Sequence, residues 1–120
     1  KQTSIDEKHF KTIIHGMEKV YTSKYGTAKT AQVKNIEICG KTGTAENSHG
    51  EDHSIFIAFA PKDKPQIAIA VYIENGGWGS TWAAPIAGLI IEKYLTGQVN
   101  NTEREHFILS GNLMDKENEK

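Results

Sequence analysis

The sequence predicts an α+β fold in which three antiparallel strands are flanked by an N-terminal and a C-terminal helix. Apolar residues recur every three or four positions over residues 5–21 and 82–96, which is typical of helices. Runs rich in β-branched and aromatic residues lie between these two segments. The runs 53–60 and 66–74 are separated by a turn containing two prolines, Pro61 and Pro65, which favours an antiparallel hairpin.

The composition is that of a single soluble domain. The chain has 120 residues and a net charge of −1, which gives no indication of a nucleic-acid partner. The longest nearly apolar run, 83–91, is interrupted by Pro85 and Gly88 and is shorter than the roughly 20 residues that cross a bilayer. The lone Cys39 cannot form an internal disulfide, and we expect it to be a small core residue.

The first helix is expected over residues 5–21. Ser4 and Glu7 have the spacing of a capping box, which predicts that Ser4 caps the helix. The helix is expected to pack on the core through one apolar stripe, formed by Phe10, Ile13, Ile14, Met17 and Val20.

Three strands are expected to follow. Residues 33–39 alternate apolar and polar side chains, which predicts a half-buried strand leading into Lys41–Thr44. Residues 53–60 are almost continuously apolar, which predicts a central strand covered on both faces. Residues 66–74 are expected to form the third strand.

The last helix is expected over residues 82–96. Pro85 fits its first turn, where no backbone N–H is needed, and Gly97 ends it. Its predicted buried stripe consists of Ile86, Leu89, Ile90 and Tyr94. Residues 1–100 are therefore one structural unit. Residues 101–120 are expected to form a polar, partly disordered tail, with a docking point at 107–109 and disorder at 115–120.

The segment Cys39–Glu46, CGKTGTAE, admits two interpretations. A nucleotide-binding P-loop would need glycine five residues before Gly40, where Asn35 stands, and a helix after Thr42. The alternative is a strand with Thr42 and Thr44 on one face and Lys41 on the other. Hydroxyls, free amides and a nearby cation suit the binding of a carboxylate and a carbonyl, so we favour the strand.

Six segments in the same order resemble the transpeptidase domains of class B penicillin-binding proteins, most of all the elongation-type penicillin-binding protein 2 group. The Lys-Thr-Gly motif lies in the third of them. They are His15–Val20, Gly26–Ala28, Gly40–Glu46, His53–Pro61, Ile67–Ser80 and Ala83–Gly97.

The resemblance implies a partial β-lactamase/transpeptidase-like fold and a role for each residue of the motif. Lys41 would steady a serine of the family's Ser-x-Asn motif and help to hold the substrate carboxylate. Thr42 and Thr44 would hydrogen-bond that carboxylate, and the Thr44 amide would be one oxyanion-hole donor. Gly43 would let the acyl group lie against the strand. The implied reaction is serine acyl transfer that cross-links peptidoglycan stem peptides, with no cofactor or metal, and β-lactams would acylate the same serine.

The nucleophile itself is missing from the sequence. No serine is followed three residues later by lysine, so Ser-x-x-Lys is absent, and we expect no Ser-x-Asn in the chain either. The family places both motifs before the Lys-Thr-Gly strand. We therefore expect the chain to be the C-terminal part of a transpeptidase domain and to be inactive alone. Its parent is expected at the periplasmic face of the bacterial inner membrane, held by an anchor upstream of Lys1.

Two alternatives stay open, a β-lactamase and a non-catalytic penicillin-sensing domain of the same fold. We also expect the chain to self-associate through an exposed sheet edge. A metal site at His49 and His53 is disfavoured, because these residues lie at a loop-to-strand junction. Glu46 is expected to be an exposed loop carboxylate. Trp78 and Trp82 are expected to pack the last helix or, alternatively, to line a substrate or partner surface.

Overall fold

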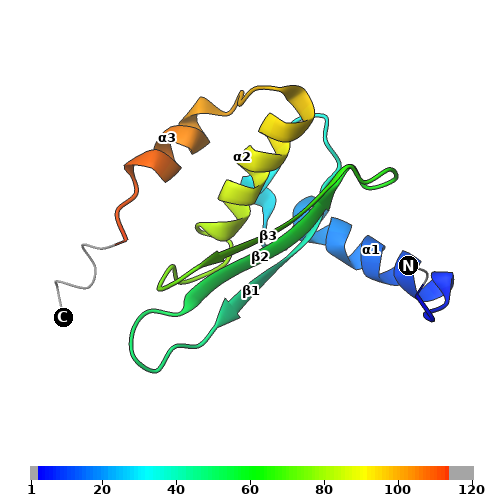
Figure 1. Cartoon of the computed structure of the whole chain (residues 1–120), viewed down its shortest axis with the longest axis horizontal. Coiled ribbons are helices and arrows are strands. Elements are labelled where there is room, and N and C mark those ends of the chain that lie inside the picture. Colours follow the sequence, from blue (N-terminus) through cyan, green and yellow to red (C-terminus); the bar gives the residue numbers. More distant parts are fainter. Residues whose placement is uncertain (1–2, 114–120) are drawn as a thin grey trace.

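The computed structural model describes residues 3–113. One three-stranded antiparallel sheet, ordered β1-β2-β3, lies between helices on its two sides (Figure 1). The predicted α+β class is confirmed. In chain order the elements are α1 (Glu7–Thr22), the short 3₁₀ helix η1 (Lys29–Ala31), β1 (Cys39–Ala45), β2 (His53–Ala60), β3 (Ile67–Ile73), α2 (Ala83–Thr96) and α3 (Thr102–Ser110).

The helix α1 contacts the sheet only near its C-terminal end. Tyr21 is 3% exposed and meets Phe56 edge-on, with 6.0 Å between the ring centres. The N-terminal turns project away from the sheet (Figure 1), so Phe10 is 38% exposed and Ile13 62% exposed. The prediction of a stripe packed on the core along the whole helix is therefore wrong for its N-terminal part.

The cap of α1 also differs from the prediction. Asp6, not Ser4, is the N-cap residue, and its side chain accepts a hydrogen bond from the Lys8 amide at 3.2 Å. A carboxylate at this position satisfies a free amide and also lies at the positive end of the helix dipole. The helix thus begins two residues later than the sequence prediction.

Residues 33–38 do not form the predicted strand. Val33 and Ile36 pair with each other across a tight turn in which Asn35 has a φ of 62°. The alternating pattern arises because Val33 and Ile38 both reach the core from this turn, at 8% and 4% exposure. The strand β1 therefore begins only at Cys39.

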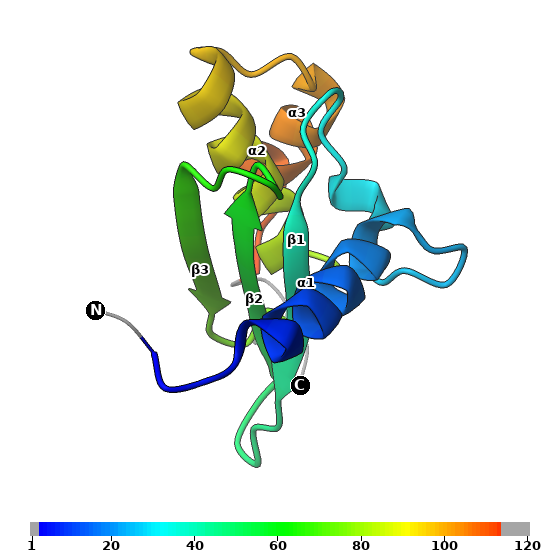
Figure 2. The same ribbon diagram turned by 90° about the vertical axis from the view of Figure 1, so that its right-hand side faces the viewer.

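The two faces of the sheet differ in burial. On the face toward α2, β2 contributes side chains that are at most 5% exposed, namely Ser54, Phe56, Ala58 and Ala60. On the opposite face Ile57 is 48% exposed and Tyr72 is 55% exposed. The prediction that β2 is covered on both faces is therefore wrong. Figure 2 shows α1 near β1 on this side, leaving β3 open.

The helix α2 packs through small residues. Ala84 and Ala87 are fully buried and Gly88 is also buried, whereas Ile90 is 44% and Tyr94 62% exposed. The predicted stripe was thus assigned to the wrong side of this helix. Small side chains allow close approach to the sheet, Ile91 is fully buried beside them, and Ile90 and Tyr94 face outward. Gly97 ends α2 with a φ of 81°, as predicted.

The helix α3 lies in the segment that the sequence analysis assigned to a tail. The Asn101 side chain caps it by accepting from the Arg104 amide at 2.9 Å. Arg104 Nη2 donates to the carbonyls of Thr30 and Gln32 at 2.7 and 2.8 Å. The Phe107 ring stacks on Trp82 with 5.1 Å between centres, which confirms Phe107 as a docking point. The predicted disorder of 115–120 lies outside the described residues.

Within residues 3–113, no helix combines the length and the apolar character that crossing a membrane requires.

Candidate active-site strand

The Lys-Thr-Gly segment lies in an edge strand. β1 pairs with β2 alone, so its other edge has no partner strand among residues 3–113. After Ala45 the chain enters a turn rather than a helix. A P-loop needs a helix there to direct amides toward phosphate, so the structure excludes the nucleotide-binding interpretation.

The side chains of β1 alternate as the sequence predicts. Thr42 lies opposite the buried Phe56, on the α2 side, whereas Lys41 lies opposite the exposed Ile57. The Lys41 ammonium donates to the carbonyl oxygen of Thr42 at 2.7 Å. Lys41 thus lies on the face opposite α2, and its charged end returns toward the strand.

The loop after α1 is attached to this strand by a hydroxyl pair. Thr27 Oγ1 and Thr42 Oγ1 are 2.9 Å apart. The neighbouring Ala28 amide donates to the Val20 carbonyl at 3.0 Å, so the loop is fixed to the end of α1 as well. The segment Gly26–Ala28, noted in the sequence only as a family resemblance, thereby orients one of the two candidate threonines.

The backbone approaches Gly43 closely, and the approaching residue is Gly79. A Cβ atom built on Gly79 would lie 2.5 Å from the Gly43 carbonyl oxygen and 3.2 Å from its nitrogen. A Cβ atom built on Gly43 would lie 3.3 Å from Ile55 Cβ. The connection between β3 and α2 therefore lies directly against the candidate strand.

Ser54 holds this connection in place, and the sequence analysis did not identify it. Ser54 is fully buried and pairs across the sheet with Thr44. Its hydroxyl donates to the Trp78 carbonyl at 3.1 Å and accepts from the Ala83 amide at 3.3 Å. A serine in a run of apolar residues is the one signal in the sequence that could have indicated such a buried bridge.

Charged groups near the start of β1 form a small cluster. Lys62 Nζ lies 2.9 Å from Glu18 Oε1, and His15 lies 3.4 Å from the other oxygen of that carboxylate. The hydrogen bond from Lys62 lowers the pKa of Glu18 and raises the pKa of Lys62. Burial raises the pKa of the Cys39 thiol, which agrees with its expected place in the core.

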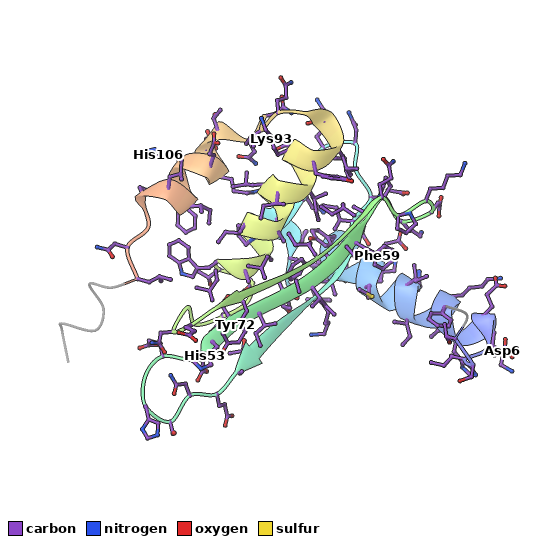
Figure 3. The ribbon with its side chains drawn as sticks, viewed as in Figure 1. Asp6, His53, Phe59, Tyr72, Lys93 and His106 are labelled. Carbon is purple, nitrogen blue, oxygen red and sulfur yellow. The ribbon has the colours of Figure 1, made fainter. Side chains whose placement is uncertain are left out.

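The loop between β1 and β2 is fixed by amides. His53 Nδ1 accepts from the Asn75 amide at 3.1 Å, and its ring lies 5.4 Å from that of Tyr72 (Figure 3). Asn47 donates to Asn75 Oδ1 at 2.8 Å. His53 thus belongs to the junction of β2 with the 74–82 connection. No group of three or more His, Cys, Asp or Glu side chains is placed to hold a metal ion within residues 3–113.

Two cavities are lined by residues other than 41–44. One, of about 850 Å³, is bounded by the end of α1, the 32–38 turn and the start of α3. Tyr21, Glu92 and Arg104 each have a buried polar atom there without a hydrogen-bond partner among the described residues. The other, of about 620 Å³, borders Thr27 and Phe107. Thr44 is exposed, whereas Thr42 is half-buried and bonds Thr27 at the border of the second cavity.

The expectation that the chain contains no Ser-x-Asn is wrong, because one such tripeptide is present at Ser110-Gly111-Asn112. It follows the Lys-Thr-Gly strand, whereas the motif of the resemblance precedes it. The Ser110 hydroxyl donates to the Phe107 carbonyl at 3.3 Å, as serines at helix ends commonly do. Through this hydrogen bond, Ser110 stabilises the C-terminal end of α3.

Known proteins match most of the chain. The model of the penicillin binding protein transpeptidase domain matches residues 1–92. The peptidoglycan D,D-transpeptidase MrdA of Haemophilus influenzae is 33% identical over 105 residues, covering 74% of this chain and 16% of that protein. The D,D-transpeptidase PbpA of Mycobacterium tuberculosis is 41% identical over 86 residues, covering 61% and 18%.

Solved structures agree with these sequence matches. The crystal structure of Pseudomonas aeruginosa PBP2 in complex with WCK 5153 matches with a TM-score of 0.70 and 33% identity, over 84% of this chain and 23% of that one. The chain thus spans about a fifth of the relatives it matches. It belongs to the penicillin-binding protein transpeptidase family, as part of a class B domain similar to MrdA, PbpA and PBP2.

Proposed function

We propose that this chain supplies one wall of the active site of a peptidoglycan D,D-transpeptidase, whose nucleophilic serine lies in polypeptide upstream of Lys1. The observation that carries the proposal is the placement of Lys-Thr-Gly on a strand edge that has no partner strand among the residues that the structure describes. A free edge offers backbone amides to a ligand that lies alongside it as an added strand.

Each residue of the motif has a role in this proposal. The hydroxyls of Thr42 and Thr44 bind the substrate carboxylate from the α2 side of β1. The Thr44 amide donates to the oxyanion that forms during acyl transfer, where one donor is worth roughly 2.7–4 kcal/mol. Lys41 acts from the opposite face and supplies positive charge to the site. Gly43 leaves room for the acyl group beside the strand.

The substrates in this proposal are peptidoglycan stem peptides, and β-lactams react with the same serine. Two Mycobacterium tuberculosis penicillin-binding protein A structures are acyl-enzyme complexes with ceftriaxone and imipenem, at TM-scores of 0.54 and 0.67 to this chain. They support β-lactam binding by the parent protein. The proposed location is the periplasmic face of the inner membrane.

Labelling with a fluorescent penicillin tests the proposal. We expect the full-length protein to label, Lys41→Ala to label at least tenfold more slowly, and this 120-residue chain not to label. Lys29→Ala, which removes an exposed lysine outside β1, serves as the matched control and should label normally. An unlabelled full-length protein beside a labelled control enzyme would refute the acyl-transfer function. Rapid loss of the label by hydrolysis would indicate a β-lactamase.

The exposed sheet leads to a separate expectation for the isolated chain. β1 and β3 each pair on one side only within residues 3–113, and unpaired edges recruit other strands. We therefore expect concentration-dependent self-association through a sheet edge. Sedimentation equilibrium at increasing concentration measures it, and a monodisperse monomer throughout the series would contradict it.

A further inference from the structure

The connection between β3 and α2 holds the chain's two tryptophans in different environments. The Trp82 ring stacks on Phe107 at an interplanar angle of 17° and packs α3 onto the molecule. The Trp78 side chain is 73% exposed. The packing role expected for both therefore applies to Trp82, and the mechanism above makes no use of Trp78.

The backbone of Trp78 is firmly held although its side chain is exposed. Its carbonyl accepts from the buried Ser54 hydroxyl at 3.1 Å and from the Thr81 amide at 2.9 Å. The next residue, Gly79, lies against the Gly43 backbone. A large apolar side chain on a loop fixed by the scaffold is well placed for recognition.

This anchoring places Trp78 beside the candidate strand. Adjacent Cα atoms are about 3.8 Å apart, so Trp78 is one peptide unit from the Gly79–Gly43 contact. Ser54, which holds the Trp78 carbonyl, is the cross-strand neighbour of Thr44. An indole at this position lies within reach of a molecule bound along Gly43 and Thr44.

We propose that Trp78 forms the subsite for the acyl acceptor, an aliphatic chain ending in a primary amine, and this inference rests on the proposed transpeptidase function. An aromatic face carries negative electrostatic potential, so it attracts an ammonium group and disfavours a carboxylate. Its area also covers the methylene groups of such a chain. The donor brings the carboxylate that Thr42 and Thr44 bind, so the acceptor is the substrate that fits Trp78.

The step that Trp78 serves is the second half of the reaction. The bound ammonium group first loses one proton to solvent, and the neutral amine then attacks the carbonyl carbon of the acyl-serine ester. A C–N bond forms, the C–Oγ bond breaks, and one proton passes from nitrogen to the serine oxygen. Water reacts in the same way with formation of a C–O bond. The ratio of amide to acid therefore measures how well the amine is bound.

The test uses the full-length protein with Trp78→Ala and Trp78→Phe. Tyr94→Ala is the matched control, because it also removes an exposed aromatic ring, but from α2 rather than from the connection that carries Trp78. Fluorescent penicillin measures acylation. A thioester donor with Nα-acetyl-lysine amide as acceptor measures the amide-to-acid ratio over a range of amine concentrations.

We expect Trp78→Ala to acylate within twofold of wild type and to lower the amide-to-acid ratio about 3- to 20-fold at low amine concentration. The KM for the amine should rise while the rate at saturation is kept, and Trp78→Phe should restore most of the loss. An unchanged ratio in Trp78→Ala, or an equal loss of acylation and ratio, would overturn the subsite alone. A wild-type protein that is not acylated would overturn the transpeptidase function and the subsite with it.

Discussion

Replacing Phe56 by alanine is expected to destabilise the chain by about 3–5 kcal/mol. Phe56 is fully buried at the centre of the face that α2 covers, and Tyr21 from α1 meets its ring edge-on. Removing the ring deletes the contact between Tyr21 of α1 and the strand β2, and it leaves a cavity under α2. Because small domains have about 5–15 kcal/mol of stability in total, this is a large share. Urea denaturation followed by tryptophan fluorescence measures the loss.

Phe59→Ala is the matched control for this prediction. Phe59 belongs to the same strand but lies on the opposite face, where it pairs with Cys39, and it is only half-buried. Figure 3 labels its side chain. Its ring stays partly in water when the chain folds, so we expect a loss of at most about 1.5 kcal/mol. Equal destabilisation by the two variants would show that the open face is buried in solution, contrary to the asymmetry described here.

The burial of individual residues explains which of the strand predictions were correct. Period-two alternation identified the strand at Lys41–Thr44 and the faces of its side chains, because neighbouring strands enforce that period. Alternation over 33–38 was misleading, because Val33 and Ile38 reach the core from a turn. A strand would place Val33 and Ile38 on opposite faces, whereas the turn at Asn35 brings both of them into the core.

The helices show a second limit of sequence patterns. Apolar residues at helical spacing located α1 and α2, but not the side that is buried. In α2 the buried side consists mainly of alanine and glycine, which a search for large apolar residues passes over. The helix α3 was missed because its stability comes from Arg104 and Phe107, whose partners Thr30, Gln32 and Trp82 are distant in sequence.

The candidate site was predictable for a different reason. Lys41, Thr42, Gly43 and Thr44 form one continuous strand, so local sequence fixes their relative placement. The supporting residues Thr27, Ser54 and Gly79 come from three other segments and are joined to the strand only by the tertiary fold. No spacing rule relates them, and the hydrogen bonds and backbone contact that place them are visible only in the structure.

Replacing Gly79 by alanine is expected to destabilise the chain by about 3 kcal/mol, the upper end of the range for overpacking. The added methyl group would overlap the carbonyl oxygens of Gly43 and Ile55, which belong to two paired strands. Backbone atoms cannot turn aside as a flexible side chain can, so the 74–82 connection must move off the sheet. The Ser54 hydrogen bond to Trp78 would then weaken.

Gly16→Ala is the control, because Gly16 lies within α1 and an added Cβ atom has no neighbour within 4 Å. Alanine favours a helix over glycine by up to about 1 kcal/mol, so this variant should be more stable than wild type. The two Gly→Ala changes therefore have opposite signs, because Gly79→Ala creates a backbone overlap whereas Gly16→Ala gains helix propensity without one. In the full-length protein, Gly79→Ala should also slow penicillin labelling, because the connection that moves lies directly against Gly43, between Thr42 and Thr44. Wild-type stability in Gly79→Ala would mean that the connection does not rest on β1, and the placement of Trp78 beside Thr44 would fail with it.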